Sequence, residues 1–271
     1  MKVDRCNIGT SLTLSEANMS TTRSPWISLT AMMVAVCLFG TSANAAPSES
    51  ILHGSGKVTK TVRKVPRFQG ILLELPADVK IIQGQTEGVS IETDDNLVSL
   101  IETVVQNDQL KIRTKRPVSW QLTALKIVVN ARIIKSIAVS GSGNVNADHM
   151  SSSNMAVSIS GSGDTNIANL NANSLSVLIS GSGNFSSSGR VEAVNATVSG
   201  SGDLNMATLA ARTIKLSMAG SGNAKVWASQ TLKVNVAGSA DVGYYGDATV
   251  TQSVDGSGSV TKLGTSPKPG D

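Results

Sequence analysis

A short phrase, Ser-Gly-Ser-Gly followed by Asn or Asp, recurs with small variations through the second half of this 271-residue chain. The first glycines of its copies are Gly141, Gly161, Gly181, Gly200, Gly220, Gly238 and Gly256. The steps between them are 20, 20, 19, 20, 18 and 18 residues. A nearly fixed period of this length predicts a solenoid, because a single repeat cannot bury its apolar face without its neighbours.

Apolar and polar residues alternate around every copy of the phrase. Two, four and six residues before the glycine stand mainly Val, Ile, Leu and Met, as at Val157 and Ile159, with Ser, Thr, Asn and Lys between them. The apolar positions resume four and six residues after the glycine. Period-two alternation predicts a strand on each side of a glycine corner, with one face buried. We therefore predict an all-β fold, a parallel β-helix.

The phrase itself indicates a corner with a polar column beside it. Glycine adopts φ > 0 without a steric penalty, so the glycine pair predicts a sharp turn at the same place in every repeat. The residue after the second glycine alternates between Asn and Asp. Adjacent carboxylates would repel, whereas an intervening Asn can donate a hydrogen bond to the Asp on either side, so we interpret this column as a structural polar ladder. Its members are Asn144, Asp164, Asn184, Asp203, Asn223 and Asp241.

The N-terminal segment has the pattern of a secretory signal peptide. An apolar run at 27–40, too short to span a bilayer, precedes an Ala-x-Ala site that predicts cleavage after Ala45. A start at Met19 rather than Met1 would give a signal of more ordinary length. A lipoprotein signal would use Cys37, which lacks the small residue needed just before it. We predict an exported protein, periplasmic or extracellular, with no transmembrane segment after cleavage.

Composition supports a repetitive β protein. Aromatic residues make up 3% of the chain and charged residues 15%, with a net charge of +4, too weak and too scattered to indicate a nucleic-acid partner. Both cysteines, Cys6 and Cys37, lie in the predicted signal. The mature chain is therefore expected to have no disulfide and no cysteine-bound metal.

We divide the chain into a signal peptide (1–45), an N-terminal β cap region continuous with the solenoid (46–135), the repeat β-helix (136–263) and a loose C-terminal tail (264–271). The cap region contains a predicted hairpin at Asn107-Asp108 and a short helix at 97–101, with N-caps offered by Asp94-Asp95-Asn96. Short strands are predicted at 70–75, 79–83, 89–93, 103–106, 109–114 and 125–130.

Several motifs are shared with a known family. They are Phe68-Gln69-Gly70-Ile71 before Pro76-Ala77-Asp78-Val79, then Asp94-Asp95-Asn96-Leu97 with Ile101-Glu102-Thr103, and finally the glycine corners. Through them the chain resembles, over roughly residues 54–263, the GIN domain family, described as the head domain of auto-transporter adhesins. The resemblance implies a right-handed, single-stranded β-helix exported by a bacterium, and it supplies no catalytic residues.

The Asn/Asp column also has enzymatic and metal-binding interpretations. Some parallel β-helices cleave polysaccharides. Asp164 and Asp203 lie two rungs apart, which corresponds to about 9 to 10 Å. That distance is near the upper end of the separation between the two carboxyl groups of an inverting glycosidase. The same position recurs in every repeat, however, as a structural ladder requires. Calcium-binding β-rolls have a shorter repeat, without Asn in alternate turns. His53 and His149 are far apart in sequence. We predict no catalytic residue, no metal and no cofactor.

Two further features have two interpretations each. Trp227 and Tyr245 each lie seven residues after a corner glycine, in adjacent repeats, and form either a sugar-stacking platform or a packed cap at the C-terminal end. The basic stretches 57–67 and 111–116 either contact anionic lipopolysaccharide or are solvated charges that discourage edge pairing.

The sequence therefore predicts a non-enzymatic, adhesin-like module of the cell surface or envelope, with a cell-surface glycan or another envelope component as its partner. The alternative is a carbohydrate-active β-helix enzyme, a polysaccharide lyase or hydrolase. A groove holding non-repeating Asp, Arg or Lys would favour the enzyme.

We expect export to remove residues 1–45, because cleavage follows the Ala-x-Ala site. Intact-mass analysis of the exported protein should give a chain that begins at Ala46. A mature chain that begins upstream of Ile27, or that keeps a lipid on Cys37, would contradict this prediction.

Overall fold

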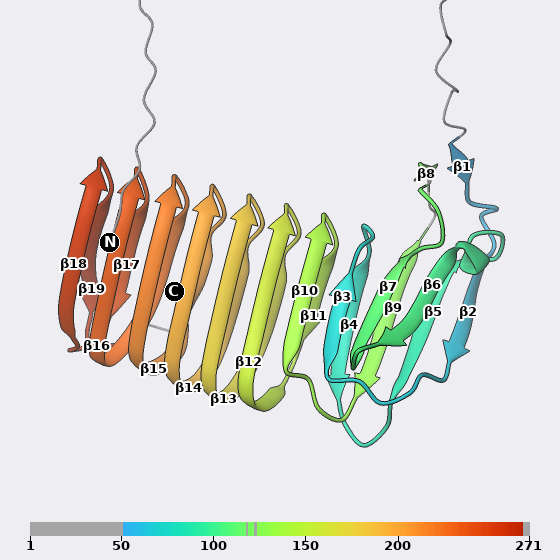
Figure 1. Ribbon diagram of the computed structural model, residues 1–271, viewed down its shortest axis with the longest axis horizontal. Helices are drawn as coiled ribbons and strands as arrows, with labels where there is room; N and C mark the ends of the chain where they lie inside the picture. Colours follow the sequence, from blue (N-terminus) through green and yellow to red (C-terminus); the bar gives the residue numbers. More distant parts are fainter. Residues whose placement is uncertain (1–50, 118, 122–123, 268–271) are drawn as a thin grey trace, which may run out of the picture. The chain divides into compact units, whose positions relative to one another are not determined.

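The computed structural model describes residues 51–117, 119–121 and 124–267 (Figure 1). The predicted signal peptide, both cysteines and residues 268–271 of the predicted tail lie outside the described residues. The described residues all belong to the compact unit Pro47–Asp271.

The repeat region is a parallel β-helix, which confirms the predicted fold. Each turn of it, a rung, pairs in register with the next, so that Gly161 lies opposite Gly181, Gly181 opposite Gly200 and Gly200 opposite Gly220. The strands are β10 (Ser136–Gly141), β11 (Asn144–Ala147), β12 (Met150–Gly161), β13 (Thr165–Gly181), β14 (Phe185–Gly200), β15 (Leu204–Gly220), β16 (Asn223–Gly238), β17 (Asp241–Tyr245), β18 (Thr249–Gly256) and β19 (Ser259–Gly264).

Each rung has two outer faces that meet at the corner. Strands that lead into the corners are β3, β10, the C-terminal parts of β12 to β16, and β18, and their outward side chains form what we call the approach face. Strands that leave the corners are β4, β11, the N-terminal parts of β13 to β16, β17 and β19, and they form the departure face. In Figure 1 the approach strands stand in front of the departure strands.

The inward positions are the predicted apolar columns. Ile159, Ile179 and Val198, each two residues before a corner glycine, are buried, and so are Phe185 and Leu204 after the corner. The outward positions between them are mostly exposed. One rung thus offers few apolar groups, and stacking joins them into one continuous core.

The two glycines of the corner have different functions. The first takes a positive φ in every copy, from +107° at Gly141 to +137° at Gly220. The second does not, so the predicted corner recurs at the same place in every rung but takes its positive φ from the first glycine alone. The second position is glycine in all copies but one, where Ala240 replaces it, because the preceding rung passes close: a Cβ on Gly183 would lie 2.3 Å from the carbonyl oxygen of Gly163 and 2.6 Å from Cγ2 of Ile159.

The cap region contributes rungs that contain no copy of the repeated Ser-Gly-Ser-Gly phrase. β3 and β4 pair in register with β10 and β11, so that Leu73 lies opposite Val139 and Asp78 opposite Asn144. The segment 74–77, which contains no glycine, therefore takes the place of the Ser-Gly-Ser-Gly corner. β7 and β9 extend the same stack by one more parallel pairing on each face.

Antiparallel strands close this end of the stack. β5 pairs with both β9 and β2, and β6 pairs with β7 through the predicted hairpin at Asn107-Asp108, whose φ values are +52° and +58°. The elements of the cap region are β1 (Leu52–His53), β2 (Val58–Arg63), β3 (Gly70–Leu73), β4 (Asp78–Gln83), β5 (Gly88–Asp94), the 3-10 helix η1 (Val98–Leu100), β6 (Ile101–Gln106), β7 (Gln109–Thr114), β8 (Trp120–Gln121) and β9 (Leu125–Ala131).

The helix predicted at 97–101 was wrong, since only the three-residue η1 forms and it has no side-chain cap. The expected capping residues bind another segment instead. Asp94 Oδ1 accepts the backbone N–H of Gly56 (2.9 Å), and Asp95 Oδ1 accepts the hydroxyl of Ser55 (2.6 Å). This bond lowers the pKa of the Asp95 carboxyl. Asn96 Oδ1 accepts the N–H of Ser55 (3.1 Å), so the three residues hold the glycine-rich turn before β2.

We expect Gly183→Ala to destabilise the fold by about 1 to 3 kcal/mol, as overpacking of a tightly packed interior does. Ser182→Ala is the matched control, because Ser182 is exposed in the same corner. Urea unfolding of both variants tests this. Equal stabilities would mean that the corner relaxes without cost and that the close approach does not restrict the sequence.

Candidate functional site

The predicted polar ladder lies on the departure face and is hydrogen-bonded from rung to rung. Asn184 donates to Oδ1 of Asp164 from Nδ2 (2.8 Å) and from its backbone N–H (3.1 Å). Its own Oδ1 accepts the backbone N–H of Asp203 (2.9 Å). Asn223 repeats the two donations to Asp203, at 3.2 and 2.7 Å. Each Asn side chain thus donates to the Asp of the preceding rung, whereas donation to the Asp on either side was expected. The side-chain hydrogen bonds of the ladder therefore all point the same way along the stack.

The ladder is longer than the six predicted residues. Nδ2 of Asn144 donates to Oδ1 of Asp78 (2.9 Å), which places a cap-region carboxylate at its start. The hydroxyl of Ser259 donates to Oδ1 of Asp241 (2.7 Å) at its other end. Asp78 belongs to the same Asp-Asn alternation, although no repeated phrase precedes it in the sequence.

Beyond Asp78 the same column continues through charged residues of alternating sign. The Cα partner of Asp78 is Lys126, that of Lys126 is Glu92, and that of Glu92 is Lys60. From Lys60 to Ser259, therefore, no two neighbours in this column carry the same charge. Like charges directly opposite each other destabilise a sheet, so the sequence of the column fits its register.

The carboxylates of the ladder are engaged in hydrogen bonds between rungs. Asp164 and Asp203 are exposed, and their Oδ1 atoms accept donors from the next rung, as the recurring position predicts. A depression of about 370 Å³ beside them is lined by the repeating Asp, Asn and Ser columns. Within the described part of the chain, no three His, Cys, Asp or Glu side chains gather as a metal site. No described helix has the length and apolar character to cross a membrane.

Trp227 and Tyr245 are strand neighbours, as their spacing predicts. Trp227 is half-buried, but Tyr245 is only 6% exposed, and its Cα partner on β19 is Gly264. A sugar-stacking platform needs open ring faces, so the geometry does not support the platform and favours the packed cap.

The basic stretches of the cap region are largely engaged within the protein. Arg63 donates to the carbonyl oxygens of Ile101 (2.7 Å) and Val98 (2.9 Å), and burial lowers the pKa of its guanidinium. Arg113 pairs with Glu102 at 2.8 Å. These contacts favour the structural interpretation of the stretches over a lipopolysaccharide site.

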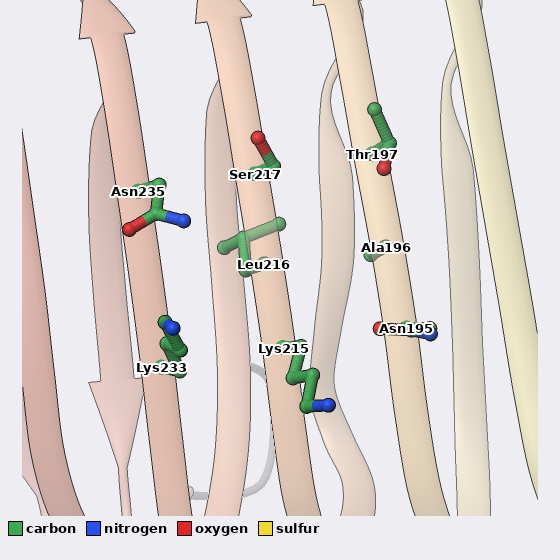
Figure 2. Close-up of a pocket in the computed structure, with 8 residues that line it drawn as sticks. All are labelled: Asn195, Ala196, Thr197, Lys215, Leu216, Ser217, Lys233 and Asn235. Atoms are coloured by element: carbon green, nitrogen blue, oxygen red, sulfur yellow. The ribbon is translucent and has the colours of Figure 1, made fainter.

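A different pair of cations lies on the approach face. Lys215 of β15 and Lys233 of β16 are direct Cα partners and both are exposed. They border a shallow depression of about 210 Å³, which Figure 2 shows with Asn195, Thr197, Ser217 and Asn235 around it. Two ammonium groups in register cost up to about 1 kcal/mol. Sequence analysis missed the pair, although both lysines stand five residues before a corner glycine in consecutive repeats.

We expect Asn184→Asp to destabilise the protein, because three carboxylates would then follow one another at about 4.8 Å, each new contact costing on the order of 1 kcal/mol. The Nδ2 bond to Asp164 is also lost. Salt should restore part of the stability by screening. Thermal melts at low and high salt test this, with Asp164→Asn as a nearly neutral control. Stabilisation of Asn184→Asp by calcium beyond the unmodified protein would refute the structural ladder.

The fold recurs in solved structures. A putative adhesin from Bacteroides fragilis has 21% sequence identity and a TM-score of 0.73, with 78% of this chain and 100% of that chain covered. A putative lipid binding protein from Parabacteroides distasonis has 24% identity and a TM-score of 0.69, covering 79% and 100%. A putative adhesin from Parabacteroides merdae has 18% identity and a TM-score of 0.61, covering 78% and 98%. These identities show the fold alone.

Among curated proteins, none matches this chain. A family model described as "Putative auto-transporter adhesin, head GIN domain" matches residues 67–248. The match contains the β3–β4 rung, the ladder up to Asp241 and the Lys215–Lys233 pair. Since it spans more than half of the sequence, this chain belongs to the GIN domain family of putative auto-transporter adhesin heads.

Proposed function

We propose that this protein is an exported, non-enzymatic binding module of the bacterial cell surface or envelope, and that it binds a cell-surface glycan or another envelope component through its approach face. The observation that carries the proposal is the Lys215–Lys233 pair, exposed among hydroxyl and amide side chains on a regular sheet surface.

The β-helix suits recognition of an extended ligand. Its outward side chains stand in columns about 4.8 Å apart from rung to rung, so a polymer lying along a face meets similar groups repeatedly. Side chains on packed strands are also held more firmly than those on loops, which lowers the entropy lost on binding. Several weak contacts then add up along the ligand.

Export is part of the proposal. The family description implies an envelope or surface location. The apolar run and Ala-x-Ala site before Ala46 supply a route out of the cytoplasm.

The alternative, a carbohydrate-active enzyme, receives no specific support from the site. Asp164 and Asp203 belong to a ladder that repeats in every rung, and the lysine pair has no neighbouring carboxylate that would serve as its acid or base partner.

We expect the exported protein to bind envelope polysaccharide without cleaving it. Biolayer interferometry on purified envelope fractions should show saturable binding, while an assay for new reducing or unsaturated ends should stay at background. Release of such ends at a rate proportional to protein concentration would make the enzyme reading correct. Absence of binding to every envelope fraction would remove the proposed function.

A further inference from the structure

We propose that the Lys215–Lys233 pair is the binding site for an anionic sugar unit, carboxylated or sulfated, of a surface polysaccharide. This inference rests on the proposed function and names the chemistry of its ligand. One acidic group would lie between the two ammonium groups, and the sugar ring that carries it would lie over the adjoining hydroxyl and amide side chains.

The first argument is the register of the two lysines. As direct Cα partners on adjacent parallel strands, they place two long, flexible cations on one stretch of surface. Figure 2 shows the Lys215 side chain extending toward the strand that carries Asn195 and away from Lys233, so rotation of its flexible chain brings both ammonium groups to one anion. Two ammonium groups on adjacent strands repel each other. One anion bound between them removes the repulsion and accepts two charge-assisted hydrogen bonds.

The second argument is that none of their directly neighbouring outward side chains neutralises them. The outward neighbours of the pair along and across the strands are Asn195, Thr213, Ser217, Thr231, Asn235 and Thr251. All are neutral. Arg212, by contrast, is paired with Glu192 at 3.0 Å. The lysine pair is thus set in a surface that leaves its charge available to a ligand.

The third argument is the contrast between the two faces. The departure face carries Asp78, Asp164, Asp203 and Asp241 along its ladder. Lys80 and Lys225 stand beside that ladder, so the departure face carries both signs. On the approach face, by contrast, the C-terminal parts of β12 to β16 (154–161, 174–181, 193–200, 213–220 and 231–238) carry no charged residue other than Lys215 and Lys233, so a polyanion meets positive charge there without an opposing carboxylate.

The surroundings of the pair favour a sugar over other anions. Asn195 and Asn235 offer both donors and acceptors, and Thr197 and Ser217 offer hydroxyl groups, which match the hydroxyl groups of a sugar ring. The residues that line the depression include no aromatic ring for base stacking, which single-stranded nucleic acids use. Lysine is a point charge without the planar fork of arginine, so carboxylate and sulfate fit equally well.

Isothermal titration at low salt tests the proposal with three probes: polygalacturonate, dextran sulfate and neutral dextran. We expect the unmodified protein to bind at least one of the two anionic polymers and not the neutral one. Lys215→Gln/Lys233→Gln should weaken that binding at least about tenfold and reduce its salt dependence. Lys64→Gln/Lys225→Gln removes the same charge from exposed lysines elsewhere and should leave the affinity within about twofold.

Two more variants separate charge from folding. Lys215→Arg/Lys233→Arg keeps the charge and should retain binding. Lys215→Glu places a carboxylate opposite Lys233. The melting temperature of this variant should therefore equal or exceed that of the unmodified protein, while polyanion binding is lost.

Equal weakening by both double Gln variants would refute the site, because net charge alone would then explain the affinity. Equal affinity for double-stranded DNA of matched charge density would refute the sugar assignment. Envelope binding that survives Lys215→Gln/Lys233→Gln unchanged would overturn this inference and leave the proposed function in place.

Discussion

The close passage of one glycine corner over the next is the contact on which this β-helix depends. A Cβ on Gly181 would lie 2.4 Å from the carbonyl oxygen of Gly161, and the first corner glycines from Gly161 to Gly256 all pass this close to the preceding rung, so that position has no room for a side chain. Repeat length varies elsewhere: the register shifts between Ile167 and Leu170, and again between Ser186 and Gly189, both on the far side of the rung. The corner is thus the fixed point, and the connection absorbs the differences between repeats.

In-register stacking turns every outward residue into a member of a column. A charged residue therefore meets its counterpart in the next rung at strand spacing, and repulsion between like charges becomes a rule for the sequence. The departure face follows the rule by placing Asn between Asp residues and by alternating Lys with Glu in the cap. The approach face departs from it at Lys215 and Lys233. Such a departure at one point in an otherwise consistent stack is expected at a binding site.

The two ends of the stack are closed differently. At the N-terminal end, antiparallel β2, β5 and β6 replace parallel rungs and cover the core. At the C-terminal end, β18 is an open edge, and Gln252 stands in a column that holds apolar residues in the other rungs. Val254, in a position that is buried elsewhere, is 38% exposed. A polar residue in the last rung lowers the cost of leaving its inner face in water.

The sequence by itself determined the repeat, the corner, the buried columns and the Asn/Asp ladder from Asn144 to Asp241, because each follows from spacing along the chain. The tertiary structure alone decided what joins them. Asp78 enters the ladder through strand pairing across 66 residues, from a corner without glycine. Likewise Asp94 accepts the backbone N–H of Gly56 rather than capping a helix, and Tyr245 is buried opposite Gly264 of the next strand. Such contacts depend on which distant segments become neighbours, and no local pattern records that.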